Sequence, residues 1–129
     1  MPARILIVED DQIIAADLRL KVQGIGHEVI GIAISGEEAI GLAERCKPDL
    51  VLMDIQLDTA MNGLDAARII QERTGASIIF VTAFPSAAVR GESVGRSGEG
   101  IYLAKPFSRV QLEAAVDSAL GRRSQRDTS

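Results

Sequence analysis

The stretch RILIVEDD, residues 4–11, joins a strand-length apolar run directly to three consecutive acids. Its apolar residues are continuous rather than alternating, which is typical of a strand buried on both faces of a parallel sheet. Further runs of the same kind follow along the chain, each separated from the last by a helical or loop segment: Glu28–Ala33, Asp49–Met53, Ser77–Val81 and Ile101–Ala104.

Helical patterns lie between most of these runs. Gln12–Val22 places Ile14, Leu18 and Val22 on one stripe. Ser35 and Glu38 have the spacing of a capping box, and that helix ends before Pro48. A third helix is predicted from about Leu64 to Glu72. The last, Ser108–Leu120, is expected to expose Arg109 and Glu113 and to bury Val110, Leu112, Val116 and Leu120.

Alternating strands and helices predict an α/β domain, a doubly wound parallel sheet covered by helices on both faces in three α/β/α layers. Residues 83–100 interrupt this alternation, because they contain four glycines and few large apolar residues. We therefore expect the fourth helix to be short, mobile or missing. Residues 1–120 are expected to form one domain, and residues 121–129, which lack apolar anchors, to form a disordered tail.

Composition limits the classes of function. The 129 residues carry a net charge of −4 and have a pI near 5.0, which argues against direct nucleic-acid binding. No apolar run approaches the roughly 20 residues that span a bilayer, so no membrane insertion is expected. Cys46 is the single cysteine and cannot form an internal disulfide, which suits the cytoplasm.

Polar side chains are concentrated where the predicted strands end. Glu9 and Asp10 follow the first strand, Asp54 follows the third, and Lys105 follows the fifth. Parallel strands place these ends at one edge of the sheet, and carboxylates gathered there favour Mg²⁺. An Asp beside Mg²⁺ and an ammonium can attack phosphorus and form an acyl phosphate, with the Thr82 hydroxyl free to donate to a phosphate oxygen.

Four motifs at these strand ends resemble the response-regulator receiver domains of bacterial two-component systems: Ile7-Val8-Glu9-Asp10-Asp11, Val51-Leu52-Met53-Asp54, Phe80-Val81-Thr82-Ala83 and Lys105-Pro106-Phe107. The resemblance covers roughly residues 3–120. It implies a flavodoxin-like, CheY-like sheet of five strands in the order 2-1-3-4-5. It also implies that the domain stands alone and signals through contact with another protein.

The resemblance also implies roles for single residues. Asp54 would accept a phosphoryl group, and Glu9 and Asp10 would organise Mg²⁺ together with Asp54 and the backbone carbonyl of Gln56. Lys105 would contact the phosphoryl group, next to a peptide to Pro106 that is commonly cis. Thr82 and Tyr102 would form the switch pair, although Tyr102 is equally well explained as an ordinary strand aromatic.

Partners follow from the same resemblance. The phosphoryl donor would be a sensor histidine kinase or a histidine phosphotransfer protein, and the output an unidentified downstream protein; a homodimer is also compatible. Such a domain catalyses its own phosphorylation and dephosphorylation and is not an enzyme with a separate substrate. The loop after Asp54 is one residue longer than usual. Ala83-Phe84-Pro85 resembles the subclass found with stress-response regulators and HWE-type kinases.

Three other functions compete with this interpretation. A degenerate receiver could act as a phosphorylation-independent docking module, but the acid pair, Asp54, Thr82 and Lys105 are all intact. A Mg²⁺-dependent phosphohydrolase of the haloacid dehalogenase type needs a second acid two residues after the nucleophile, where this chain has Gln56. A flavin-binding domain needs a phosphate loop after the first strand. Asp11 is assigned a structural role at the first helix, and His27 a surface position.

Overall fold

The computed structural model describes residues 2–57, 61–83 and 101–128. Five parallel strands form one sheet in the order β2-β1-β3-β4-β5. The strands are β1 (Arg4–Val8), β2 (Glu28–Ala33), β3 (Leu50–Asp54), β4 (Ser77–Thr82) and β5 (Ile101–Ala104). The helices are α1 (Gln12–Gly24), α2 (Gly36–Cys46), α3 (Gly63–Thr74) and α4 (Arg109–Thr128). The predicted flavodoxin-like sheet and its strand order are confirmed.

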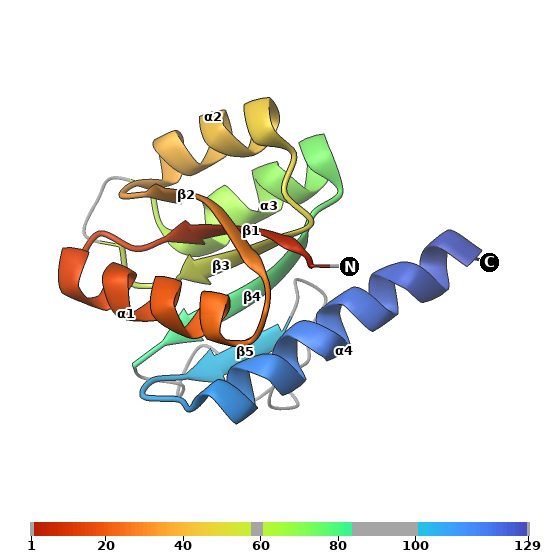
Figure 1. Ribbon diagram of the computed structural model, residues 1–129. Coiled ribbons are helices and arrows are strands. Elements are labelled where there is room, and N and C mark those ends of the chain that lie inside the picture. The colour runs from red at the N-terminus through yellow and green to blue at the C-terminus, as the bar shows by residue number, and fades with distance from the viewer. Residues whose placement is uncertain (1, 58–60, 84–100, 129) are drawn as a thin grey trace.

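Helices cover both faces of the sheet (Figure 1), with α2 and α3 on one side and α1 and α4 on the other. Successive strand residues point to opposite faces, so Leu6 and Val8 join the core under α2 and α3, while Ile5 and Ile7 join the core under α1 and α4. Every residue of β3 is buried. This two-sided burial explains why the apolar runs in the sequence are continuous rather than alternating.

The helix starts follow local capping chemistry. The Asp11 side chain caps α1 by accepting hydrogen bonds from the amides of Ile13 and Ile14 at 2.9 and 3.1 Å, which confirms its structural role. Ser35 caps α2 by accepting from the Glu38 amide, and the Glu38 carboxylate accepts in return from the Ile34 amide. The Ser35 half of the predicted capping box is therefore formed, whereas the return bond from Glu38 goes to the amide before the cap, that of Ile34, and not to that of Ser35.

The strand order fixes where a site can be built. The chain begins in β1, second from one edge of the sheet, moves outward to the edge strand β2, and returns to the central strand β3 on the other side of β1. The helices that leave the carboxyl ends of these strands therefore diverge to opposite faces and leave a crevice between them. Val8 pairs with Met53, so the residues that follow β1 lie level with the end of β3.

Two predictions about the last helix are wrong. Val110 is 75% exposed, because the buried stripe of α4 contains Leu112, Ala115, Val116 and Ala119, and Val110 lies about 200° around the helix from Leu112. The helix also continues to Thr128 and does not end at Leu120. Residues 122–128 include no glycine or proline, so a helix already anchored on the sheet can propagate through them.

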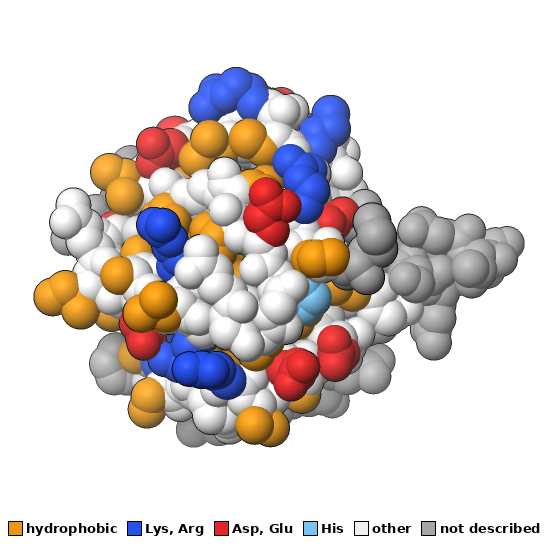
Figure 2. Space-filling view, viewed as in Figure 1, with side chains coloured by type: hydrophobic (Ala, Val, Ile, Leu, Met, Phe, Trp, Pro, Cys, Tyr) orange, Lys and Arg blue, Asp and Glu red, His pale blue; other side chains and the backbone are white. Residues whose placement is uncertain are grey.

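The expected weak fourth helix, in residues 83–100, lies almost entirely outside the described residues. Within the described ranges, no helix combines the length and the apolar content needed to cross a bilayer. Figure 2 shows Lys and Arg side chains on the visible face scattered among acidic and apolar ones rather than gathered into one stripe.

Candidate functional site

Three acidic side chains converge where β1 and β3 end. Glu9 and Asp10 directly follow β1, and Asp54 is the last residue of β3. One carboxylate oxygen from each of the three lies within 4.8 Å of the others. Glu9 is 2% exposed and Asp54 3%, whereas Asp10 is half-buried. The structure thus brings together the three acids that the sequence assigned to a metal site.

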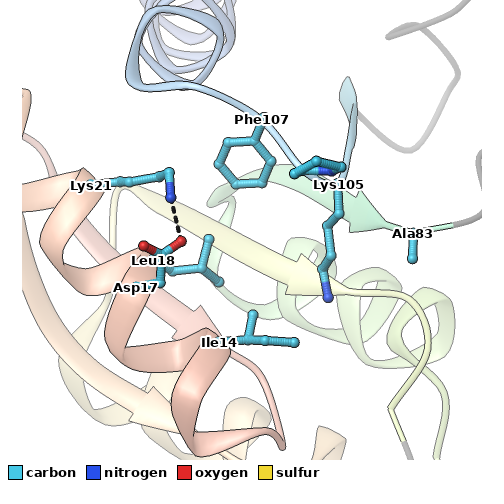
Figure 3. Close-up of a pocket in the computed structure, with 8 residues that line it drawn as sticks. Ile14, Asp17, Leu18, Lys21, Ala83, Lys105 and Phe107 are labelled. Carbon is cyan, nitrogen blue, oxygen red and sulfur yellow. Dashed lines mark hydrogen bonds and ion pairs between the residues drawn. The ribbon is translucent and has the colours of Figure 1, made fainter.

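Lys105 reaches this cluster from β5. Its ammonium nitrogen lies 3.1 Å from Glu9 Oε1 and 3.6 Å from Asp54 Oδ2, and its side chain is 18% exposed. The Lys105 amide donates to the Thr82 carbonyl at 2.8 Å, and the peptide to Pro106 is cis, as the resemblance implied. Figure 3 shows the side chain extending from the end of β5 into the crevice. One cation is therefore shared by two buried carboxylates.

Burial changes the acidity of Glu9. Loss of solvation raises the pKa of this carboxyl group from 4.5 to about 7. The negative charge of Asp54 also raises the pKa, while hydrogen bonds from the Asp11 amide and Lys105 lower it. Because burial is the largest cause, the ionised form of Glu9 is costly in the protein without metal, and a cation bound beside it would lower that cost.

Asp54 is held by its own backbone neighbours. Asp54 Oδ1 accepts a hydrogen bond from the Gln56 amide at 2.9 Å. The Ile55 amide donates to the Val81 carbonyl at 3.1 Å, which ties the start of the following loop to β4. The first residue of α3, Gly63, lies so close that a Cβ there would come within 2.2 Å of the Asp54 carbonyl oxygen. Asp54 is therefore packed between the sheet and the start of α3.

The end of β4 presents two hydrogen-bond donors next to Asp54. The Thr82 hydroxyl and the Ala83 amide both donate to the side-chain oxygen of Gln56, at 3.4 and 3.2 Å. The resemblance assigned the main-chain carbonyl of Gln56 to the metal and its position to the tuning of dephosphorylation, but it did not indicate these hydrogen bonds of the carboxamide. The position of Gln56 next to β4 was predictable from the strand order, but the direction of its side chain was not.

Tyr102 lies in the core and not in the acidic cluster. Its ring stacks on Phe80, its neighbour on β4, with centroids 5.0 Å apart, and the residue is 9% exposed. Phe80 and Thr82 are two residues apart on the same strand, so Tyr102 and Thr82 belong to the same face of the sheet. This placement is compatible with both interpretations of Tyr102, as a packing residue and as a switch.

A cavity of about 330 Å³ opens beside Lys105 (Figure 3), between α1 and the segment that follows β5. Lys21 forms an ion pair with Asp17 on α1, and its ammonium lies 5.9 Å from the centroid of the Phe107 ring. This cavity was not predictable from the sequence, since its residues come from separate segments: Ile14, Asp17, Leu18, Lys21, Ala83, Lys105, Pro106 and Phe107.

The donor set suits a hard divalent cation. Carboxylate oxygens are the ligands that Mg²⁺ prefers, and Glu9, Asp10 and Asp54 each offer one in the same crevice. The ammonium of Lys105 lies 3.6 Å from Asp54 Oδ2, and the donors at the end of β4 directly follow Val81, which pairs with Asp54. Such an arrangement can neutralise negative charge that gathers on oxygens attached to Asp54.

A doubly wound parallel sheet with an acidic crevice and a lysine at its strand ends defines a narrow class of α/β proteins. The family model described as the response regulator receiver domain matches residues 5–117. The chain belongs to this family. The predicted resemblance to receiver domains is thus confirmed over most of its length.

Individual relatives agree. The phyllosphere-induced regulator PhyR of Methylorubrum extorquens is 40% identical over 121 residues, which cover 93% of this chain and 44% of the relative. The crystal structure of the response regulator PhyR from Brucella abortus matches with a TM-score of 0.87 and 36% identity, covering 98% of this chain and 51% of that one. The chain therefore spans about half the length of these PhyR relatives.

A third relative is a receiver domain alone. The crystal structure of the receiver domain of the sensor histidine kinase PA1611 from Pseudomonas aeruginosa is 29% identical, with a TM-score of 0.79. The match covers 94% of this chain and 99% of that one. That structure is described as having a magnesium ion coordinated in its active-site cleft.

Proposed function

We propose that this domain accepts a phosphoryl group on Asp54 in a two-component phosphorelay and passes the signal on by contact with another protein. The observation that carries the proposal is the buried Asp54 carboxylate, with two further carboxylates within 4.8 Å and Lys105 Nζ at 3.6 Å. Membership of the receiver family supports the same assignment.

In the phosphorelay the donor is a phosphorylated histidine nitrogen, supplied by a sensor histidine kinase or a histidine phosphotransfer protein. An oxygen of Asp54 forms a bond to phosphorus, the bond from phosphorus to the donor imidazole breaks, and its electron pair returns to the ring, which takes up a proton. Lys105 neutralises charge on the phosphoryl oxygens. The domain turns over no separate substrate and catalyses only its own phosphorylation and dephosphorylation.

Glu9, Asp10 and Asp54 would hold Mg²⁺, with the Gln56 carbonyl as a further protein ligand. Bound there, Mg²⁺ supplies positive charge to the phosphoryl oxygens. The metal in the PA1611 receiver domain supports this choice. Thr82 and Tyr102 would then transmit the change, Thr82 by a new hydrogen bond to the phosphoryl group and Tyr102 by its packing on Phe80. A cytoplasmic location of this domain is consistent with a sensor histidine kinase or a histidine phosphotransfer protein as the phosphoryl donor.

The test is formation of the acyl phosphate. The protein is incubated with Mg²⁺ and acetyl phosphate, and intact mass is followed. We expect a Mg²⁺-dependent phosphoryl adduct that is lost in Asp54→Asn. Asp65→Asn, which removes an exposed acid in the first turn of α3, is the matched control and should retain the adduct. An adduct that persists in Asp54→Asn, or no adduct at all, would contradict the proposal and favour a docking module.

A further inference from the structure

The carboxamide of Gln56 occupies hydrogen-bond donors at the end of β4, the strand that pairs with the end of β3 where Asp54 lies. Gln56 is two residues after Asp54, and its side-chain oxygen accepts from the Ala83 amide at 3.2 Å and from the Thr82 hydroxyl at 3.4 Å. The bond from Ala83 has the length of an ordinary hydrogen bond, and the one from Thr82 is long. The Ala83 amide is therefore the main partner of this side chain.

We infer that Gln56 competes with the phosphoryl group for hydrogen-bond donors. In the unphosphorylated protein its carboxamide oxygen accepts from donors at the end of β4, and a phosphoryl oxygen on Asp54 replaces it as their acceptor. This inference rests on the proposed function. It assigns to Gln56 a positioning role separate from its main-chain carbonyl: the side chain sets the free-energy difference between the unmodified and the modified site.

The two acceptors exclude each other. The Ala83 amide has a single hydrogen, so it serves one strong acceptor at a time. A phosphoryl oxygen carries negative charge, and hydrogen bonds to a charged acceptor are about twice as strong as those to a neutral amide oxygen. Phosphorylation therefore exchanges these hydrogen bonds for stronger ones and does not simply add new ones.

The Gln56 side chain can move into solvent when a phosphoryl oxygen displaces it. Gln56 is exposed, while its neighbours in sequence, Ile55 and Leu57, are half-buried and buried. Its carboxamide can therefore turn to water without opening the core, and the main chain can stay in place, held by the bond from the Gln56 amide to Asp54 Oδ1. Release of Gln56 changes the surface next to the site at little cost in packing.

Removal of the carboxamide tests the inference. Gln56→Met keeps the length of the side chain and removes the competing acceptor. In saturating Mg²⁺ we expect beryllofluoride, which binds Asp54 as a phosphoryl mimic, to bind the variant about three- to tenfold more tightly, since one to two neutral hydrogen bonds no longer stabilise the free state. Gln23→Met, at an exposed position near the end of α1, is the matched control and should bind like the wild type.

A second readout separates this role from a general effect on folding. The amide proton of Ala83 in the unmodified protein should move upfield in Gln56→Met, as expected for a lost hydrogen bond, and should approach the same position in both proteins once beryllofluoride is bound. Equal affinities with an unmoved Ala83 amide would overturn the inference while leaving the proposed function intact. If neither protein binds beryllofluoride, the proposed function fails and the inference fails with it.

Discussion

Glu9 shows how strongly one residue can be affected by where the fold places it. Its carboxyl group is 2% exposed, next to Asp54 and within 3.1 Å of Lys105. Burial is the largest influence and raises the pKa from 4.5 to about 7. At neutral pH the ionised form of this side chain is therefore held at a free-energy cost, and two consequences can be measured.

The first consequence concerns the protein without metal. Between pH 4.5 and about 7, folded Glu9 keeps a proton that the unfolded chain has released. The stabilising contribution of this proton is full below pH 4.5 and is lost as the pH rises through about 7. Urea unfolding in chelator should therefore show the wild type losing stability relative to Glu9→Gln over this range. Parallel pH dependences of the two proteins would contradict the assignment.

The second consequence concerns Mg²⁺. A metal needs the ionised carboxylate, so Mg²⁺ affinity should be highest above pH 7. Below about pH 7 the affinity should fall, and the decrease should approach about tenfold for each further pH unit. Calorimetric titration at pH 8, 7 and 6 measures this dependence. A variant that retains Asp10 and Asp54 but carries Glu9→Gln should bind Mg²⁺ weakly and with a flatter pH profile.

Residue identities at the site were largely predictable. Glu9, Asp10, Asp54 and Lys105 follow apolar strands, and parallel strands place such residues at one edge whatever the details of packing. The Gln56 side chain was not predictable, because its direction depends on the conformation of the loop after Asp54 and on its hydrogen bonds to donors at the end of β4. The cavity beside Lys105 escaped for the same reason, since it forms only when α1 and Phe107 meet.

At the scale of elements, the approach of α3 to β3 depends on one glycine. A Cβ at Gly63 would lie 2.2 Å from the Asp54 carbonyl oxygen and 3.0 Å from Ile55 Cα. Both neighbours are main-chain atoms of a fully buried strand and its continuation, so neither can move aside easily. The start of α3 thereby fixes the position of the Asp54 main chain at the end of β3.

Gly63→Ala should therefore destabilise the protein by about 1–3 kcal/mol, as overpacking does elsewhere, and should slow phosphorylation of Asp54. Gly41→Ala is the matched control, because a Cβ at this position within α2 would meet only the Arg45 side chain at 3.4 Å. It should stabilise the protein by about 0.5–1 kcal/mol through helix propensity. Chemical unfolding of the two variants checks both signs, and equal effects would show that the close approach is not limiting.

Element boundaries were predicted to within two residues for all strands and for the first three helices, because caps and breakers mark them in the sequence. Asp11, Ser35, Asn62 and Gly75 each act where such residues usually do. The end of α4 was predicted wrongly at Leu120, because Gly121 and the polar residues after it were taken to end the helix, although residues 122–128 contain no glycine or proline. Val110 was assigned to the buried face by its chemistry, while the helical period places it outside.

At the scale of the whole molecule, one sheet separates two cores. Ile70 belongs to the core under α2 and α3, and Leu112 to the core under α1 and α4; they are 1% and 0% exposed. The strands contribute to both cores, so loss of packing on one face removes support from the other. The two layers should unfold together and not one after the other.

Ile70→Ala and Leu112→Ala should each cost about 2–5 kcal/mol and lower the midpoint of a single transition. Val110→Ala, at an exposed position on α4, should change stability by less than about 0.5 kcal/mol. Thermal unfolding followed by far-ultraviolet circular dichroism and by methyl resonances from both faces measures this. If circular dichroism and the methyl resonances gave different unfolding midpoints in either variant, the two faces of the sheet would unfold independently.

The uninterrupted course of α4 past the sheet has a use in protein engineering. From Gly121 to Thr128 the helix advances about 12 Å beyond the residues packed on β4 and β5, as the last turns in Figure 1 show. A reporter fused after Thr128 would be held by a continuous helix, so its orientation relative to the receiver domain would be fixed. Each residue added to or removed from this helical segment would rotate the reporter by about 100° around the helix axis. A short series of linkers would therefore place the reporter at a series of defined orientations.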